Sequence, residues 1–270
     1  MNRRLRRLLL ATTGVTAFTA LVGVYTAEFG AGLACDARWP LCDGAVYGLF
    51  PANLPSFIEW FHRLVAMIAG FLVLGTTGLV WTRGESRRIR LATLGALVVL
   101  PTQIVLGALT VTTYRIAVLT AHFATAALIL GLLIAATVWA YADAVGATLP
   151  RIRRAALAVL LAVPVLVALT PRLFVVYRDV VQLTYYGLGF GIFAALCVVV
   201  LWARELDAGE TTAVWAPAAA ATFLVPAVLV GGRLHFGDAG QLLLVGATLA
   251  VFGLTLASFL ATRRLQRRRL

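Results

Sequence analysis

Long apolar runs alternate with short polar segments along the whole chain. A run of about 20 apolar residues crosses the roughly 30 Å hydrocarbon core of a bilayer as an α-helix, and most buried segments of soluble proteins are shorter. The pattern predicts eight spans, over residues 7–27, 57–82, 90–111, 116–141, 153–171, 179–203, 213–232 and 239–262. We therefore expect an all-α polytopic membrane protein with eight transmembrane helices.

The first apolar run follows the basic segment MNRRLRR, which is also typical of a secretory signal peptide. The run is longer than the apolar core of such a peptide and lacks a clear small-x-small cleavage site. It is therefore predicted to remain as an uncleaved first helix.

Composition excludes a soluble globular domain. The chain of 270 residues is 61% hydrophobic and 13% charged, with a mean hydropathy of +0.95, whereas soluble proteins are about 45–50% apolar and about 25% charged. The net charge of +12 comes entirely from arginine, because the chain has no lysine.

The arginines are distributed unequally between the two sides of the predicted topology. Seventeen of the 23 lie on one side, in segments 3–7, 83–90, 151–154, 204 and 263–269. An excess of basic residues marks the cytoplasmic side, and an even number of spans then places both termini there. The pattern indicates a multi-pass protein of the cell (plasma) membrane, with lipid and not nucleic acid as its surroundings.

Two halves of the sequence resemble each other. The second apolar run ends with GLVWTRGE and the sixth ends with the similar VVLWAREL. The third run contains LPTQIVLGAL, which is more weakly similar to LVPAVLVGGRL of the seventh. The chain is therefore predicted to form two four-helix bundles in one orientation. We expect an N-terminal half over 1–145 and a C-terminal half over 146–270.

Two of the three histidines lie at similar depths in the predicted bundle. His62 and His122 follow the outer ends of the second and fourth spans by distances that correspond to about 9–11 Å along a helix. Imidazole is a ligand of haem iron, and helical bundles often hold cofactors between facing helices. Two such imidazoles can bind one haem from opposite sides. The alternative is that each ring bonds a nearby carbonyl or loop residue.

An acid and a base flank the first of these histidines. Glu59 precedes His62 by one helical turn and shares its face, so its carboxylate could handle protons or stabilise a developing positive charge. It could also be a favourable acid at a helix start, or the partner of Arg63. Arg63 could reach a haem propionate or extend to the membrane rim.

The cysteines divide into a pair and a single residue. Cys35 and Cys42 flank DARWPL in the long outer loop, where an oxidising compartment favours a disulfide, either a structural link or a redox-active pair. Cys197 lies in the sixth span and is predicted to pack as a small apolar side chain.

These motifs together resemble the haem A synthase family, whose members convert haem O to haem A. The resemblance rests on GAGLACDARWPLCDG in the outer loop, IEWFHRLVA in the second span, TQIVLGALTV in the third and LTAHFATA in the fourth. It covers residues 1–142 through these motifs and the remainder through topology.

The resemblance implies a substrate-haem site in the N-terminal half. His62 and His122 correspond to its axial iron ligands and Glu59 to the acid implicated in oxidising the porphyrin methyl group to a formyl group. Cys35 and Cys42 correspond to an outer pair thought to form a disulfide that assists electron or haem transfer. The implied haem groups are haem O as substrate and haem A as product, with haem b possible at the same site.

The C-terminal half departs from the family pattern. Members with eight spans usually carry a second histidine pair that binds haem b, but Leu183 falls opposite His62 and Gln241 falls near the counterpart of His122. His235 is the only histidine of this half. We therefore expect a degenerate C-terminal half without haem ligands, serving as a scaffold.

Two other functions fit parts of this pattern. A bis-histidine b-type cytochrome that carries electrons would need His62 and His122 but not Glu59 or the cysteines. A non-catalytic haem-binding protein of oxidase assembly would fit the lost second pair. A transporter fits less well, because the ionisable groups gather toward one face. The expected partners are haem O synthase, terminal oxidase assembly factors, a membrane electron donor and a second copy of the chain.

Overall fold

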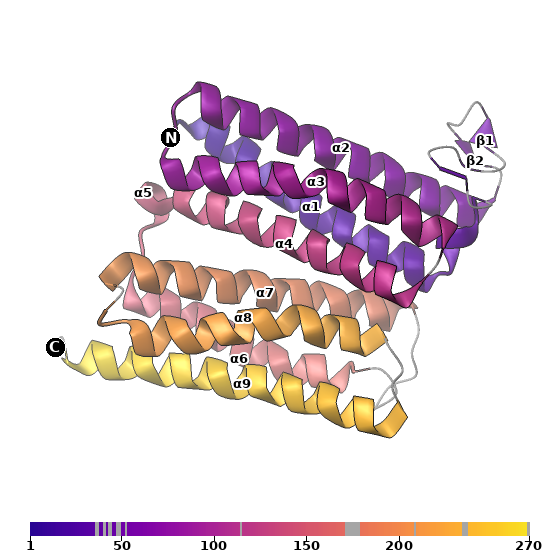
Figure 1. Ribbon diagram of the computed structural model, residues 1–270. Coiled ribbons are helices and arrows are strands. Elements are labelled where there is room, and N and C mark those ends of the chain that lie inside the picture. Colours follow the sequence, from indigo (N-terminus) through magenta and orange to yellow (C-terminus); the bar gives the residue numbers. More distant parts are fainter. Residues whose placement is uncertain are drawn as a thin grey trace. The chain divides into compact units, whose positions relative to one another are not determined.

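The structure is a computed structural model of the chain (Figure 1). It describes residues 1–35, 38–39, 42, 45–46, 50–51, 53–113, 115–170, 179–207, 209–233 and 237–268. Its helices are α1 (Arg3–Glu28), η1 (Ala31–Leu33), α2 (Leu54–Thr82), α3 (Arg87–Thr112), α4 (Ile116–Ala140), α5 (Ala142–Val145), α6 (Leu149–Ala168), α7 (Asp179–Asp207), α8 (Thr212–Arg233) and α9 (Gly237–Arg268).

The chain divides into two compact units, Met1–Ala140 and Tyr141–Leu270. In the first unit α1 packs on α2, α2 on α3, α3 on α4, and α4 returns to α1. The second unit repeats this ring with α6, α7, α8 and α9. In each ring the second and fourth helices stand at opposite corners, so a group on one can face a group on the other across the interior.

Seven of the helices in the described part of the chain are long and apolar enough to cross a membrane: α1, α2, α3, α4, α7, α8 and α9. The predicted span over 153–171 corresponds to α6, which carries Arg151, Arg153 and Arg154 in its first turns. Its charge-free part, 155–168, is only about 21 Å long at 1.5 Å per residue. An eighth crossing and the side on which the termini lie therefore remain predictions.

Threonine hydroxyls link three of the four helix pairs of the first unit. Thr12 bonds Thr76 between α1 and α2 at 2.8 Å, and Thr13 bonds Thr137 between α1 and α4 at 2.8 Å. Thr77 donates to the carbonyl of Thr93 between α2 and α3 at 3.2 Å. Interhelical hydrogen bonds in membranes are worth about 0.6 kcal/mol on average, so together they fix the register of the bundle.

Two short strands lie in the segment that precedes α2. A two-residue antiparallel ladder joins β1 (Ala45–Val46) to β2 (Phe50–Pro51), pairing Ala45 with Pro51 and Val46 with Phe50. The side chain of Asn53 then accepts a hydrogen bond from the amide of Ser56 at 2.9 Å, and proline follows in the first turn. Both features are helix-start signals, and they set the depth of every later residue of α2.

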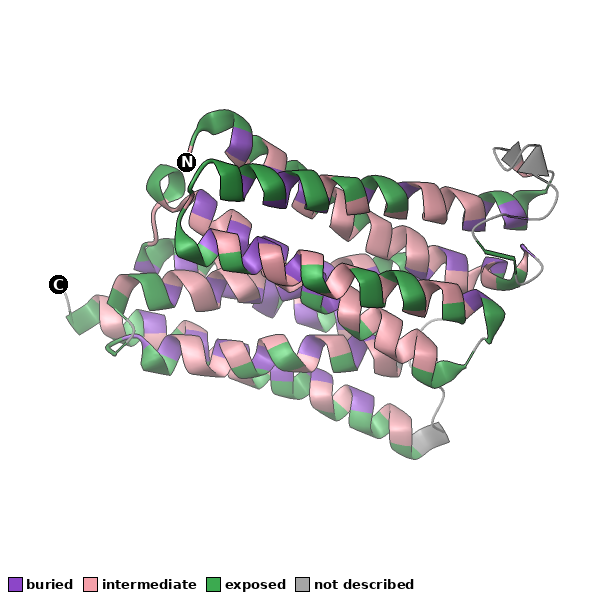
Figure 2. Ribbon diagram, turned by 45° about the horizontal axis from the view of Figure 1, so that its top comes forward, coloured by how far each residue is buried: buried purple, intermediate pink, exposed green. Residues whose placement is uncertain are grey.

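Aromatic side chains fill the interior of the second unit. Tyr185 and Tyr186 are 0% and 2% exposed, with their rings edge to face at 5.4 Å. The hydroxyl of Tyr185 donates to the carbonyl of Val228 on α8 at 3.0 Å. Large apolar side chains such as Phe71 and Phe223 are instead 66% and 83% exposed, as expected of lipid-facing positions. Figure 2 shows how buried and exposed residues alternate along the helices.

Replacing Tyr185 with Phe should lower the free energy of unfolding by about 1 kcal/mol, because a buried hydroxyl that bonds a second helix is lost. Thr184→Val is the matched control, since the exposed Thr184 hydroxyl bonds only the Val180 carbonyl of its own helix. Thermal denaturation in detergent, followed by circular dichroism, measures the difference. Equal midpoints for the two variants would contradict a role for this bond in holding α7 to α8.

Candidate functional site

The two histidines lie at similar depths on opposite corners of the first ring. His62 follows the first residue of α2 by about 12 Å along the helix, and His122 follows the first residue of α4 by about 9 Å. Both rings are only partly exposed. Both of the residues singled out in the sequence therefore belong to one interior region of the first unit.

Each imidazole packs against a glycine of a neighbouring helix. A Cβ atom at Gly23 of α1 would lie 2.8 Å from Cε1 and 3.2 Å from Nε2 of His62. A Cβ atom at Gly107 of α3 would lie 3.2 Å from Cε1 of His122. The first distance is closer than real contacts allow, so the His62 ring occupies space that only a glycine leaves open. Both rings thus face helices of their own unit.

A polar chain also reaches His122 from α3. The side-chain amide of Gln103 lies 3.3 Å from Nε2 of His122, and the hydroxyl of Thr125 contacts Oε1 of the same amide. Thr125 follows His122 by one turn on α4, and Gln103 precedes Gly107 by one turn on α3. Hence the same two turns of α3 provide both the apolar and the polar contacts of this ring.

Glu59 and Arg63 form an ion pair at the mouth of the site. Nε of Arg63 donates to Oε1 of Glu59 at 2.8 Å, and Glu59 is 4% exposed. A second donor of Arg63, Nη1, bonds the carbonyl of Arg38 in the outer loop at 3.0 Å. Of the interpretations left open by the sequence, a local partnership between Glu59 and Arg63 is therefore present. A contact between Arg63 and a haem propionate remains a prediction.

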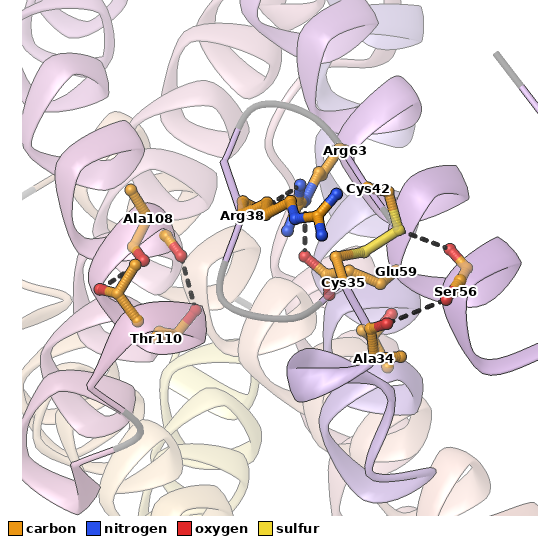
Figure 3. Close-up of polar contacts among 12 residues, drawn as sticks. Ala34, Cys35, Arg38, Cys42, Ser56, Glu59, Arg63, Ala108 and Thr110 are labelled. Carbon is orange, nitrogen blue, oxygen red and sulfur yellow. Dashed lines mark hydrogen bonds and ion pairs between the residues drawn. A yellow bond between two sulfur atoms is a disulfide. The ribbon is translucent and has the colours of Figure 1, made fainter. Parts of the chain in front are cut away.

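A disulfide between Cys35 and Cys42 closes part of the loop that precedes α2, and Ser56 in the first turn of α2 contacts this closed segment (Figure 3). Sγ of Cys42 lies 3.4 Å from the carbonyl oxygen of Ser56, and the hydroxyl of Ser56 donates to the carbonyl of Ala34 at 3.0 Å. Arg38, which accepts the bond from Arg63, belongs to the segment enclosed by this disulfide. The loop therefore supports the ion pair from outside. A redox role of the cysteines remains a prediction, and Cys197 is a free thiol on α7.

The chemistry of these residues fits a haem better than a bare metal ion. Among the described residues no group of three His, Cys, Asp or Glu side chains could hold a metal ion alone. A haem iron needs only two axial ligands, and imidazole is one of the usual ones. Nδ1 of both His62 and His122 is buried without a hydrogen-bond partner among those residues. Buried polar groups left unpaired are costly, which is expected of rings placed for a ligand.

The second unit carries other residues at the positions that correspond to the histidines. Leu183, opposite His62 in the repeat, is 39% exposed. Leu244 of α9 packs against Gly231 of α8. A Cβ atom placed at Gly231 would lie 3.1 Å from Cδ1 of Leu244. Gly231 and Leu244 thus make a contact between α8 and α9 like the contact of Gly107 and His122 between α3 and α4. His235 lies outside the described residues.

Sequence reasoning did not single out Gln103, Thr125, Gly23 or Gly107. A lone glutamine inside the apolar run LPTQIVLGAL was the available signal, because amides are rare in hydrocarbon. The glycines carried no signal of their own, since glycine is frequent in membrane helices.

Comparison with known proteins agrees with this geometry. The family model COX15-CtaA, described as cytochrome oxidase assembly protein, matches residues 50–171, a stretch that includes Glu59, His62, Gln103 and His122. Haem A synthase of Bacillus licheniformis is 36% identical over 110 residues, which are 40% of this chain and 35% of that protein. The resemblance to the haem A synthase family is confirmed.

Two further proteins are similar to parts of this chain. Haem A synthase of Alkalihalophilus pseudofirmus is 28% identical over 145 residues, 53% of this chain and 48% of that protein. Protoheme IX farnesyltransferase of Halobacterium salinarum is 38% identical over 102 residues, 37% of this chain and 22% of that protein. The chain thus spans from about a fifth to a half of the length of these relatives.

The Gly23→Ala variant should bind haem on the order of tenfold more weakly than the unaltered chain. The added methyl group meets the His62 ring at 2.8 Å, and overpacking of this kind typically costs about 1–3 kcal/mol. Gly75→Ala is the matched control, because nothing lies within 4 Å of a Cβ placed there. Haem titration followed by absorption measures both variants. Equal affinities would show that Gly23 does not position the His62 ring.

Proposed function

We propose that this chain is a membrane oxidoreductase of the haem A synthase type, which converts the C8 methyl group of haem O to the formyl group of haem A. The observation that carries the proposal is the pairing of His62 and His122 at opposite corners of one four-helix ring and at similar depth. The family match supports it.

His62 and His122 would hold the substrate through its iron, one from α2 and one from α4. The contacts of the two rings with Gly23 and Gly107 would hold both rings in place before the substrate binds. Preorganised contacts of this kind reduce the entropy cost of binding and of orienting the reacting group. The apolar side chains of the bundle would exclude water from the bound substrate.

Glu59 is the residue that would act at the reacting edge. It lies one turn outward from His62 on the same face of α2, and its Oε1 is held by Nε of Arg63. With water as the source of the oxygen, oxidation of a methyl group to a formyl group releases protons and electrons, and an oxidant in the membrane must take up the electrons. A carboxylate fixed at this place can accept a proton, position a water molecule or stabilise positive charge on the ring.

Arg63 would serve a second purpose at the same edge. It already balances the charge of Glu59, because a buried carboxylate without a partner is strongly destabilised. Its further bond to the Arg38 carbonyl keeps the guanidinium at the mouth of the site, where the propionates of a bound haem would lie nearest to water. We further propose a membrane electron donor, haem O synthase and terminal oxidase assembly factors as partners.

Replacing either His62 or His122 with Ala should weaken haem binding by more than about tenfold and abolish the low-spin absorption bands. Even residues that only support metal ligands are worth roughly 10–100-fold in affinity. The measurement is the haem-to-protein ratio and the spectrum of the purified variants. Full low-spin haem in both variants would exclude these residues as ligands and remove the basis of the proposal.

Glu59→Gln should leave haem bound but reduce haem A formation at least a hundredfold, because the amide can neither accept a proton nor carry charge. Co-expression with haem O synthase, followed by pigment extraction and chromatography, measures the product. Glu205→Gln, at an exposed acid of α7, is the control. Unchanged haem A in Glu59→Gln would refute the assigned role. Haem b alone in the unaltered chain would indicate an electron carrier, and haem without any haem A an assembly protein.

A further inference from the structure

The two histidines are not equivalent in their surroundings. Nδ1 is buried without a partner in both rings. No hydrogen bond joins Nε2 of His62 to any of the described residues. Nε2 of His122, by contrast, faces the amide of Gln103 at 3.3 Å.

The Gln103 amide is itself held in place. The hydroxyl of Thr125 contacts Oε1 of Gln103, and the same hydroxyl lies 3.0 Å from the carbonyls of Ala121 and His122. Thr125 is thus tied to the backbone of the turn that carries His122. The same turn of α4 therefore holds both the Gln103 amide and the His122 ring.

Either orientation of this amide engages Nε2, which lies farther from the helix backbone than Nδ1 and is the nitrogen through which His122 would bind iron. If the NH₂ group faces the ring, it donates to the Nε2 lone pair, and that lone pair is no longer available to a metal. If the carbonyl faces the ring instead, Nε2 must carry a proton to donate, and a protonated nitrogen cannot ligate. In both cases His122 must break its contact with Gln103 before Nε2 can bind iron.

We propose that Gln103 is a positioning residue that makes His122 the exchangeable axial ligand and leaves His62 as the permanent one. This inference rests on the proposed function, in which both histidines bind the substrate haem. Gln103 competes with iron for Nε2 of His122 and receives the ring when it leaves the metal.

A hydrocarbon interior makes such a partner useful. An imidazole that left the iron without finding another partner would leave a buried polar atom unsatisfied, at a large cost. With Gln103 one contact away, the exchange replaces one partner by another. The substrate can then enter beside His62 alone, and the product can leave without two strong ligands being broken at once.

The test compares Gln103→Leu with the unaltered chain, both purified whole and titrated with haem. Loss of a hydrogen bond of ordinary net strength should tighten low-spin haem binding by about threefold to tenfold. It should also slow CO binding to the ferrous protein by a similar factor, because CO must displace His122. Thr102→Val, at the exposed neighbouring position of α3, is the control and should leave both quantities unchanged.

A second variant keeps the test valid if Gln103→Leu does not fold. Thr125→Val retains the glutamine but frees its amide, so both effects should appear in the same direction and be smaller. A merely structural role of Gln103 would lower thermal stability without changing the CO rate. Unchanged or weaker low-spin binding, or an unchanged CO rate, in variants that fold would overturn the inference.

Failure of the proposed function gives a different result. If the unaltered chain forms no low-spin haem, or if His122→Ala retains it, then His122 is not a ligand and both the function and this inference are wrong. If low-spin haem requires His62 and His122 but Gln103→Leu behaves as the unaltered chain does, only the inference is wrong.

Discussion

A histidine among apolar helices must find partners for two ring nitrogens, because hydrocarbon offers none. The first unit places two such rings at opposite corners of its bundle and leaves Nδ1 of each unpartnered. Its other features follow from this constraint. Gly23 and Gly107 provide the space that the rings need, the threonine bonds fix the register at which the glycines face them, and Gln103 engages one nitrogen of one ring. A bundle that needed only stability would fill this region with side chains, as the second unit does with Tyr185 and Tyr186.

The charged groups are arranged outward from the histidines. Glu59 is buried and paired, Arg63 joins it to the Arg38 carbonyl, and the disulfide of Cys35 and Cys42 holds the surrounding loop to the start of α2. Each step moves one layer closer to water. This order keeps the Glu59 carboxylate near the two histidines with its charge balanced by Arg63. It also means that the conformation of the loop affects the position of Glu59.

The sequence predicted the parts of the site that depend on distance along one helix. The depths of His62 and His122 and the shared face of Glu59 follow from helix geometry alone, and the structure places them accordingly. Contacts between helices could not be predicted in this way. That Gly23 faces His62, or that Gln103 reaches His122 and not lipid, depends on helix register and rotation. The three arginines at the start of α6 left its crossing undecided for a different reason, since they shorten the apolar run. In the second unit the missing histidines were visible in the sequence, but the burial of Tyr185 and Tyr186 was not.

The central claim is that the imidazoles of His62 and His122 bind one iron between them. Pulsed electron paramagnetic resonance of the ferric haem-loaded protein, produced with ¹⁵N-labelled histidine, tests this claim directly. The account predicts a single low-spin haem per chain whose signal shows hyperfine coupling to two axial imidazole nitrogens. A low-spin signal coupled to only one histidine, or a protein with high-spin haem throughout, would contradict it.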